Sequence, residues 1–578
     1  MSVTKHWEKM FAALIVGSLI LSACSTATPQ VIEKVVTQVV KETVIVEGTP
    51  QVVEKEVTKI VEVEKVVTAT PSPKGPSVGG KLVWAIGSEP DTLDEHKTSL
   101  AAANVILGFL GATLTAKDPD GKIVPYLAES WKSSKDGLTW EFTLKKGIKF
   151  HDGTPMTAAD YAWTFQRLLD PDTKSPIVGS LGPLESVEAV DDYTLQLTLK
   201  EPYFPLLASL ASAYQPLSRT AIEEGGDLYG HSPMGVGPYK FKEWQVGNKV
   251  VLERNPDFAW GPDFTHDGPF YIQTIEFRFV PEAATIMAGL ETGEIDYADE
   301  WAFVEAKDIP RLRDMGKFQI FTGIFQGMRP YVAMNLDKPP FDDVRVRKAF
   351  NLAVNREALI KVILQGNGVP LWGPMSPSQI GYWSGVEDIG YGYDLEQAKA
   401  LMNEAGFTMG SSGLLEKDGE PLKLEIKTFA IDIYVKTCEV LKEQFKELGV
   451  ELNIMQQDVG IHNSQVLAGD YHLAAFAIGW PEADVLYMLF HSSQIGALNS
   501  SQTKDPELDK ILEKTRTETD STKRQEWVNE AQKNLVENAV VVPLFALQKF
   551  VVLNNQVQGA VWSPEANLLY LNDAYIEE

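Results

Sequence analysis

Histidine and cysteine, the residue types that most often bind metals or act as bases and nucleophiles, are few in this sequence and poorly spaced for those roles. The eight histidines are at positions 6, 96, 151, 231, 266, 462, 472 and 491. None forms an i, i+4 pair on a predicted helix or joins a cysteine cluster, so zinc and haem sites have no support. His151 beside Asp152 could act as a base, but Gly153 follows and indicates a turn, which favours a structural role. We therefore expect no metal and no cofactor.

The other common catalytic motifs are also missing from the sequence. It has no glycine–serine nucleophile elbow and no phosphate loop, so a hydrolase or a nucleotide-binding enzyme is not supported. The 79 Asp and Glu residues against 52 Lys and Arg residues give a formal net charge of −27, which repels nucleic acid and anionic lipid. Thirteen tryptophans without a catalytic constellation fit a protein that encloses a ligand rather than transforming it. We expect a binding protein and not an enzyme.

One cysteine, Cys24, has a chemistry set by its place in the chain. Lys5 and Lys9 precede an apolar run over residues 11–21, which has the layout of a signal peptide and is too short to span a bilayer. The run ends in Leu-Ser-Ala-Cys, which resembles the lipobox of bacterial lipoproteins, in which the cysteine is acylated and becomes the mature N-terminus. We therefore expect residues 1–23 to be removed and Cys24 to hold the protein on the extracytoplasmic face of a bacterial membrane. Only Cys438 then remains, so no disulfide is expected.

The segment that follows Cys24 has an unusual composition. Residues 25–79 contain no aromatic residue and no leucine, while Val, Glu, Lys and Thr recur in related phrases. Such low-complexity sequence cannot join a packed core, and we expect residues 24–79 to be a lipidated, flexible tether. A weak coiled coil is the alternative, although the glycine and proline at positions 48 and 50 interrupt it.

The elements that position any site in the remaining chain alternate between strand and helix patterns. Residues 139–145 and 193–199 alternate apolar and polar residues, which predicts half-buried strands, and Thr157 with Asp160 predicts a capped helix start between them. Residues 422–426 and 450–454 also alternate, and a helical face that includes Cys438 lies between them. This strand–helix–strand order predicts a parallel pair and a mixed α/β fold, with Cys438 as a small core residue.

Several phrases, in order along residues 80–578, resemble a known family. They are Leu-Ala-Glu-Ser-Trp at 127–131, Asp-Gly-Leu-Thr-Trp-Glu-Phe-Thr-Leu at 136–144, Gly-Ile-Lys-Phe-His-Asp-Gly-Thr-Pro at 147–155, Gly-Val-Gly-Pro-Tyr at 235–239, Gly-Glu-Ile-Asp at 293–296 and Pro-Pro-Phe-Asp-Asp-Val-Arg-Val-Arg-Lys-Ala at 339–349. Together they resemble the extracellular solute-binding proteins of family 5, the oligopeptide, dipeptide and nickel type that deliver cargo to ABC importers.

This resemblance implies an architecture with defined parts. It implies a two-lobed periplasmic-binding-protein-like (type II) α/β fold with an extra subdomain, in which the lobes close by hinge motion over a central cleft. Lobe I would take residues 80–115, 233–325 and 546–578, subdomain II residues 116–232, and lobe III residues 326–545. The protein would act as a monomer that works with an ABC permease complex.

The resemblance also implies where a ligand binds. In peptide-binding relatives, the main chain corresponding to Ser99, Leu100 and Ala101 pairs with an extended ligand, as in strand addition. Relatives carry an aspartate after a Gly-Trp pair that receives the α-ammonium of the peptide. Here the phrase is shortened, so either Glu482 or Asp484 substitutes or the ammonium site is gone.

The sequence therefore predicts a membrane-anchored substrate-binding component of an ABC importer that takes a peptide or another small polar solute. If the cargo is a peptide, replacing Glu482 or Asp484 should weaken binding at least a hundredfold. An alternative is an oligosaccharide receptor of the same fold, in which Trp372, Trp383 and Trp480 stack on sugar rings. A surface sensor or chaperone-like protein that uses the cleft without transport is a further alternative. The identity of the solute stays open.

Overall fold

The computed structural model describes residues 31–46, 49–64, 76–266, 268–299 and 304–577. The chain divides into two units, Met1–Gly75 and Pro76–Glu578. The signal peptide and Cys24 lie outside the described residues. Among the residues that are described, no helix is both long and apolar enough to cross a membrane.

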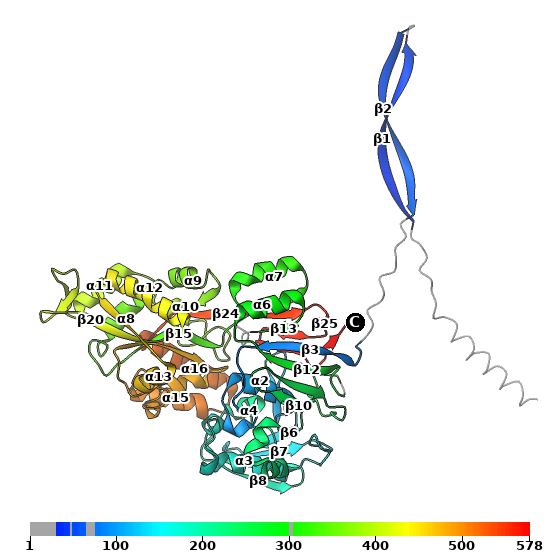
Figure 1. Ribbon diagram of the computed structural model, residues 1–578. Helices are drawn as coiled ribbons and strands as arrows, with labels where there is room; N and C mark the ends of the chain where they lie inside the picture. Colours follow the sequence, from blue (N-terminus) through cyan, green and yellow to red (C-terminus); the bar gives the residue numbers. More distant parts are fainter. Residues whose placement is uncertain (1–30, 47–48, 65–75, 267, 300–303, 578) are drawn as a thin grey trace, which may run out of the picture. The chain divides into compact units, whose positions relative to one another are not determined.

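The first unit contains a long antiparallel hairpin. Strand β1 (Val31–Val46) pairs with β2 (Thr49–Glu64) along its whole length, in a register that places Val31 opposite Glu64 (Figure 1). This corrects the expectation of a coil or a coiled coil. The repeated Val, Ile and Thr residues are β-branched, which favours extended backbone over helix. The tethering role of the segment stays a prediction.

The second unit contains three main sheets, of which the first is mixed and has helices on both faces (Figure 1). Its strand order is β10-β11-β12-β3-β13-β24-β14, and β16 pairs with β24. The side chains of β3 alternate between two cores, with Leu82 and Trp84 packing in the core that includes α2 (Ala101–Leu110) and Val83 packing toward α6 (Ala283–Thr292) and α7 (Ile309–Met315). The strands are β3 (Gly79–Ile86), β10 (Tyr239–Gln245), β11 (Lys249–Arg254), β12 (Ile272–Phe279), β13 (Tyr297–Ala298), β14 (Phe318–Ile324), β16 (Gly368–Pro370) and β24 (Phe545–Asn554).

The second sheet has four antiparallel strands in the order β6-β7-β9-β8. They are β6 (Ala128–Ser133), β7 (Thr139–Leu144), β8 (Leu184–Asp191) and β9 (Thr194–Leu199), and α3 (Ala158–Leu169) packs on them. The helix starts with a capping box in which Asp160 accepts from the backbone N–H of Thr157 at 2.8 Å. The strands predicted at 139–145 and 193–199 and the capped helix start are confirmed.

The third sheet has the order β21-β20-β22-β15-β23 and holds the predicted parallel unit. Strand β20 (Lys423–Phe429), helix α12 (Asp432–Leu448) and strand β21 (Glu451–Gln457) follow one another, and the two strands pair in parallel. Helix α13 (Val459–Leu467) then leads to β22 (Leu473–Gly479), and β15 (Gly327–Met334) and β23 (Val541–Pro543) complete the sheet. Cys438 is fully buried on α12, and burial raises the pKa of its thiol to about 12, as expected for an inert core residue.

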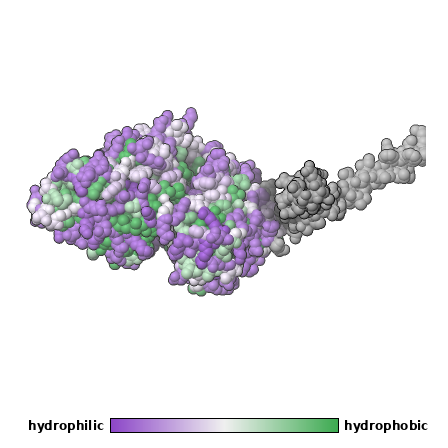
Figure 2. Space-filling view, turned by 90° about the horizontal axis from the view of Figure 1, so that it is seen from above, coloured by the Kyte–Doolittle hydropathy of each residue, from purple (hydrophilic) through white to green (hydrophobic). Residues whose placement is uncertain are grey.

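Two direct connections link the main path of the first sheet with the third sheet, apart from the excursion of the chain through β16. One crossing is at Phe325 and Gln326, between β14 and β15, and the other is at Leu544, between β23 and β24. The backbone N–H of Phe325 donates to the carbonyl of Leu547 at 2.8 Å, so the first crossing is hydrogen-bonded to the strand that follows the second. Two adjacent crossings are the usual form of a hinge between lobes. The space-filling view shows an indentation in the outline between the parts that these crossings connect (Figure 2).

Shorter elements complete the second unit. They are β4 (Thr115–Lys117), β5 (Ile123–Pro125), α4 (Leu206–Ser212), α5 (Arg219–Gly225), α8 (Val344–Leu352), α9 (Arg356–Ile363), α10 (Val386–Ile389), α11 (Leu395–Glu404), β17 (Thr408–Met409), β18 (Leu415–Lys417), β19 (Glu420–Pro421), α14 (Asp484–Phe490), α15 (Pro506–Thr517), α16 (Ser521–Glu537), β25 (Val557–Gln558), β26 (Val561–Ser563), β27 (Leu568–Tyr570) and β28 (Tyr575–Ile576).

Candidate functional site

A cavity of about 640 Å³ opens beside the segment that was predicted to pair with a ligand. This volume is in the usual range for sites that bind small molecules. Ser99 and Ala101 are among its lining residues, so two of the three predicted main-chain positions lie at the cavity. Its walls are rich in aromatic side chains, namely Trp84, Phe109, Tyr126, Phe264, Phe270, Tyr297, Trp562 and Tyr570.

Several separate elements bring these rings together. Strand β3 supplies Trp84, which meets Tyr297 of β13 edge to face, with ring centroids 4.3 Å apart. Phe109 of α2 contacts the other side of Trp84 at 5.8 Å. At the far wall, the hydroxyl of Tyr570 in β27 donates to the carbonyl of Lys117 at 2.9 Å. The walls are therefore fixed by packing and hydrogen bonds before any ligand arrives.

The polar groups of the cavity are few. The indole nitrogen of Trp84 has no acceptor among the described residues, but it is itself buried, so only the ring of Trp84 belongs to the cavity wall. Asn104, Gln215 and Asn572 add further polar groups to the lining. The cavity can therefore hold an amphipathic ligand with apolar faces and a few hydrogen-bonding atoms.

The segment at the rim of the cavity is extended, and one of its residues, Ser99, has an unpaired main chain among the described residues, whereas the N–H of Leu100 donates to Oγ1 of Thr98 and its C=O accepts from Asn104. Thr98 has φ −132° and ψ 151°, and Leu100 has φ −72° and ψ 133°, both in the extended region. None of the hydrogen bonds among the described residues uses the main-chain N–H or C=O of Ser99. Leu100 is 45% exposed. At the cavity, the segment thus offers the free N–H and C=O of one extended residue, Ser99, to which a ligand main chain could pair as in strand addition.

Buried charges immediately before this segment hold it in place. Asp94 forms an ion pair with Arg167 at 2.6 Å. Glu95 accepts hydrogen bonds from the backbone N–H groups of Tyr214 and Gln215, each at 3.0 Å. Burial raises the pKa of Glu95 to about 7, although these two hydrogen bonds act in the opposite direction. The sequence offered no signal for the role of Glu95, because its two partners are 119 and 120 positions away.

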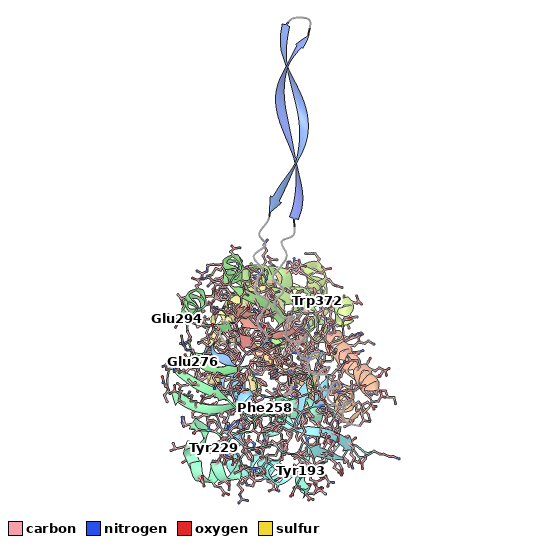
Figure 3. The ribbon with its side chains drawn as sticks, turned by 90° about the vertical axis from the view of Figure 1, so that its right-hand side faces the viewer. Tyr193, Tyr229, Phe258, Glu276, Glu294 and Trp372 are labelled. Atoms are coloured by element: carbon pink, nitrogen blue, oxygen red, sulfur yellow. The ribbon has the colours of Figure 1, made fainter. Side chains whose placement is uncertain are left out.

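The three tryptophans considered for sugar stacking do not line this cavity. Trp372 and Trp383 belong to the part of the chain that contains the third sheet, and Figure 3 shows Trp372 well separated from Tyr193 of the antiparallel sheet. The guanidinium of Arg356 lies over the ring of Trp372, 5.2 Å from its centroid. Trp480 follows β22, and its backbone N–H donates to Gln326 at the crossing. Their role in ligand binding stays a prediction.

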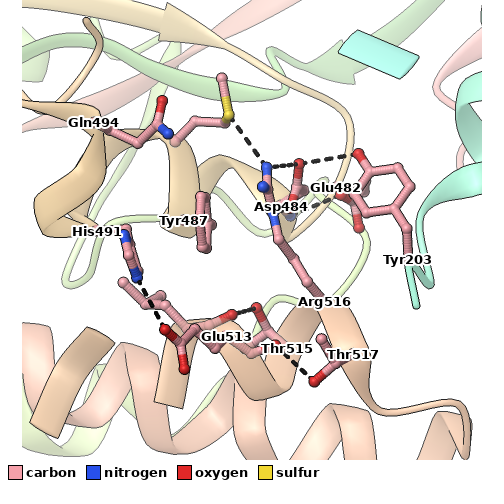
Figure 4. Close-up of polar contacts among 12 residues, drawn as sticks. Tyr203, Glu482, Asp484, Tyr487, His491, Gln494, Glu513, Thr515, Arg516 and Thr517 are labelled. Carbon is pink, nitrogen blue, oxygen red and sulfur yellow. Dashed lines mark hydrogen bonds and ion pairs between the residues drawn. The ribbon is translucent and has the colours of Figure 1, made fainter. Parts of the chain in front are cut away.

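The two carboxylates after Trp480 are buried and paired with arginines. Figure 4 shows Asp484 between Arg516 and Tyr203. Glu482 is 7% exposed and accepts from Arg524 at 2.8 Å and from the backbone N–H of Asp484 at 2.7 Å. Asp484 is 2% exposed and accepts from both Nε and Nη2 of Arg516, at 2.5 and 2.8 Å. Burial raises the pKa of Glu482, and Arg524 acts against that shift. Every carboxylate oxygen in the phrase therefore already has a donor.

This cluster also joins the antiparallel sheet region to the third-sheet region. The hydroxyl of Tyr203 donates to Asp484 at 3.2 Å, and the backbone N–H of Phe204 donates to the carbonyl of Arg516 at 2.8 Å. The guanidinium of Arg524 lies over the ring of Phe204, 4.4 Å from its centroid. A ligand ammonium could reach either carboxylate only by displacing an arginine. Whether one does so is untested, and the ammonium site stays a prediction.

No group of three or more His, Cys, Asp or Glu residues in the described part of the chain is arranged to hold a metal ion. The aromatic walls of the cavity were not predicted from the sequence. They come from segments that are far apart, and single aromatic residues at such spacing carry no motif. A cluster of apolar residues at 568–571 is the one local hint of the C-terminal wall.

Comparison with known proteins gives consistent matches across the second unit. A model of the bacterial extracellular solute-binding proteins, family 5 (middle), matches residues 122–497. The oligopeptide-binding protein AppA of Bacillus subtilis is 28% identical over 505 residues, which cover 85% of this chain and 91% of that protein. The periplasmic oligopeptide-binding protein OppA of Escherichia coli is 29% identical, with 86% and 92% covered. The structure of AppA in complex with a nonapeptide matches with a TM-score of 0.70 at 26% identity, covering 87% of this chain and all of that one.

Proposed function

This chain belongs to the bacterial extracellular solute-binding proteins of family 5, the substrate-binding components of ABC importers, and on this basis we propose that its cargo is a short peptide bound in extended form. Members of this family are not enzymes, and they act outside the cytoplasm. The function therefore lies in the capture of a solute and its delivery to a permease.

The observation that carries the peptide proposal is the unpaired, extended main chain at Ser99. A peptide that lies along this edge gains main-chain hydrogen bonds that do not depend on its sequence. Its side chains then enter the aromatic cavity, where Asn104, Gln215 and Asn572 are among the polar lining residues. AppA and OppA are named for oligopeptide binding, which supports the same cargo class.

An oligosaccharide is the second candidate. Two observations favour it, namely the eight aromatic rings that line the cavity and the pairing of Glu482 and Asp484 with arginines, which leaves no free carboxylate in that phrase for an ammonium group. A neutral sugar needs no such carboxylate.

We further propose that lobe I (80–115, 233–325 and 546–578), subdomain II (116–232) and lobe III (326–545) close over the ligand by bending at the two crossings. The hydrogen bond from Phe325 at the first crossing to Leu547 in β24, the strand that follows the second crossing, supports a common hinge axis. We also propose that the protein is a monomer and that acylated Cys24 anchors it to the membrane. Replacing Cys24 by Ser should release the protein from membranes, and membrane association that persists would contradict the anchor.

A thermal-shift screen tests the cargo class directly. The protein is heated with short peptides of varied length, with oligosaccharides and with single amino acids, each at the same concentration. A rise in Tm with peptides and none with oligosaccharides supports the proposal, because binding to the folded state stabilises it. A rise with oligosaccharides alone would replace the peptide with the second candidate.

A further inference from the structure

The charged residues that line the aromatic cavity differ in their balance from those of the protein as a whole. The chain carries a formal net charge of −27. Among the residues that line the cavity, however, two are basic and one is acidic, namely Lys117, Lys549 and Asp299. Clefts with low-dielectric walls concentrate the field of the charges that line them. An anionic group is therefore repelled by most of the surface and meets an excess of positive charge inside the cavity.

Two of these three charged residues are already engaged within the fold. Asp299 is buried, and both Asp299 and Lys549 have interactions with other parts of the chain. The ammonium of Lys549 donates to the carbonyl of Asn567 at 2.8 Å and lies over the ring of Trp562, 5.8 Å from its centroid. These two residues therefore have little left to offer to a ligand.

Lys117 is the cation of the cavity that has no partner. Its carbonyl accepts from the hydroxyl of Tyr570, but no hydrogen bond or ion pair among the described residues includes its ammonium. The side chain is partly buried, and burial lowers the pKa of the ammonium without a carboxylate that acts in the opposite direction. A cation that is partly removed from water and unpaired gains most from an anionic partner.

The wall that carries Lys117 also offers apolar surface. Strand β4 pairs with β5, which places Lys117 opposite Ile123, and the hydrogen bond from Tyr570 fixes the same residue from the C-terminal segment. The ring of Tyr570 packs edge to face against Phe264, with centroids 5.6 Å apart. Lys117, Phe264 and Tyr570 all line the cavity. The wall thus combines one cation with two aromatic rings.

We propose that this wall binds an acidic side chain of the peptide, so that the cargo is a peptide with a Glu residue at one position. Lys117 receives the carboxylate, and Phe264 and Tyr570 contact the methylene groups that carry it. The inference rests on the proposed peptide cargo and narrows its chemical class. Side chains of an extended peptide alternate in direction, so the acidic residue is required where a side chain enters the cavity and not along the whole peptide.

Native mass spectrometry of the protein with three pentapeptide libraries tests the proposal. All three have free termini and the same uncharged residues, and they differ in a single Glu, Gln or Lys residue at a random position. Lys117→Met removes the cation and keeps most of the hydrocarbon, and Lys117→Glu reverses the charge. Lys122→Met is the matched control, because this lysine is outside the cavity lining, pairs with Asp120 and has a side chain that is 72% exposed.

The expected result is a preference that depends on the charge at position 117. We expect the parent to bind the Glu library about tenfold better than the Gln library, because hydrogen bonds between charged groups contribute more than neutral ones. Lys117→Met should bind the Glu and Gln libraries equally, with the Gln library bound as in the parent. Lys117→Glu should prefer the Lys library to the Glu library, and Lys122→Met should behave like the parent.

The other outcomes separate failure of the subsite from failure of the peptide cargo. If the parent binds the Glu and Gln libraries equally, the subsite is overturned and the peptide cargo stands. If Lys117→Met keeps the preference for Glu, or loses the Glu and Gln libraries to the same extent, Lys117 does not bind the acidic side chain and the proposal is also overturned. If no library binds to the parent, the peptide cargo falls, and the subsite falls with it.

Discussion

The aromatic cavity beside α2 and the acidic phrase after Trp480 differ in what they leave available to a ligand. The cavity has open aromatic walls and, at its rim, the main chain of Ser99 without a partner among the described residues, while the phrase pairs each of its carboxylates with an arginine. The sequence pointed to the phrase, because acidic residues after Gly-Trp stand out, and it gave little sign of the cavity. A charged residue in a motif is thus a candidate for binding only if the fold leaves it without an internal partner.

The contrast between the two regions predicts first that the paired carboxylates of the acidic phrase stabilise the folded state. Replacing Arg524 by Met leaves the buried carboxylate of Glu482 unpaired, and we expect the free energy of unfolding to fall by about 3–5 kcal/mol at pH 8. The loss should shrink as the pH falls, because burial already raises the pKa of Glu482 and loss of the cation raises it further. Urea unfolding at several pH values measures this effect.

Two matched variants sharpen this first prediction. Lys436→Met breaks an ion pair whose side chains are 57% and 78% exposed, and it should cost less than about 1 kcal/mol. Glu482→Gln combined with Arg524→Met should recover part of the loss, because no charge is then left buried alone. Equal free energies of unfolding for Arg524→Met and Lys436→Met would contradict the prediction that the buried ion pair matters more than the exposed one.

The second prediction concerns the buried carboxyl that anchors the cavity rim. The folded state holds the proton of Glu95 up to a pKa of about 7, against an ordinary value of 4.5. The stability that goes with this proton is present below about pH 4.5 and is lost as the pH rises through 7, a difference of about 3 kcal/mol. Glu95→Gln should therefore show a flatter dependence of unfolding free energy on pH than the parent. Identical slopes between pH 5 and pH 8 would contradict this role of Glu95.

A smaller effect is expected at the contact between Tyr203 and Asp484. Tyr203→Phe removes one of three hydrogen bonds to a buried carboxylate, and we expect a loss of about 1.5 kcal/mol of unfolding free energy. Tyr393→Phe is the matched control, because its hydroxyl contacts exposed Glu447 at 3.4 Å and should contribute little. Equal urea midpoints for the two variants would show that the Tyr203 contact adds no stability.

The smallest expected effect is on the first unit. Deleting residues 25–79 should leave the affinity for cargo unchanged, because residues up to Gly75 belong to a different unit from the cavity and only the first residue of β3, Gly79, is lost from the sheet. Calorimetry with a peptide found by the thermal-shift screen compares the two proteins. A tenfold loss of affinity, about 1.4 kcal/mol, would assign the segment a part in the binding site.

Local sequence predicted the regular elements well and the site only in part. Alternation predicted the strand Thr139–Leu144, and the pair Thr157 and Asp160 predicted the start of the next helix, because both signals come from neighbouring residues. The hairpin at 31–64 was missed, since low complexity was taken as evidence for coil, although β-branched residues favour strands. The cavity walls were missed because Trp84 and Tyr570 are brought together only by tertiary packing.

One titration tests directly whether the acidic phrase is available to cargo. The affinity of a peptide from the screen, with a free or an acetylated N-terminus, is measured by calorimetry for the parent and for the variant with both Glu482→Gln and Arg524→Met. This variant removes one buried pair as a unit. We predict that both forms of the peptide bind to parent and variant within about twofold, a difference of less than 0.5 kcal/mol. A hundredfold loss for the free peptide that disappears for the acetylated peptide would instead show that Glu482 receives the ammonium group.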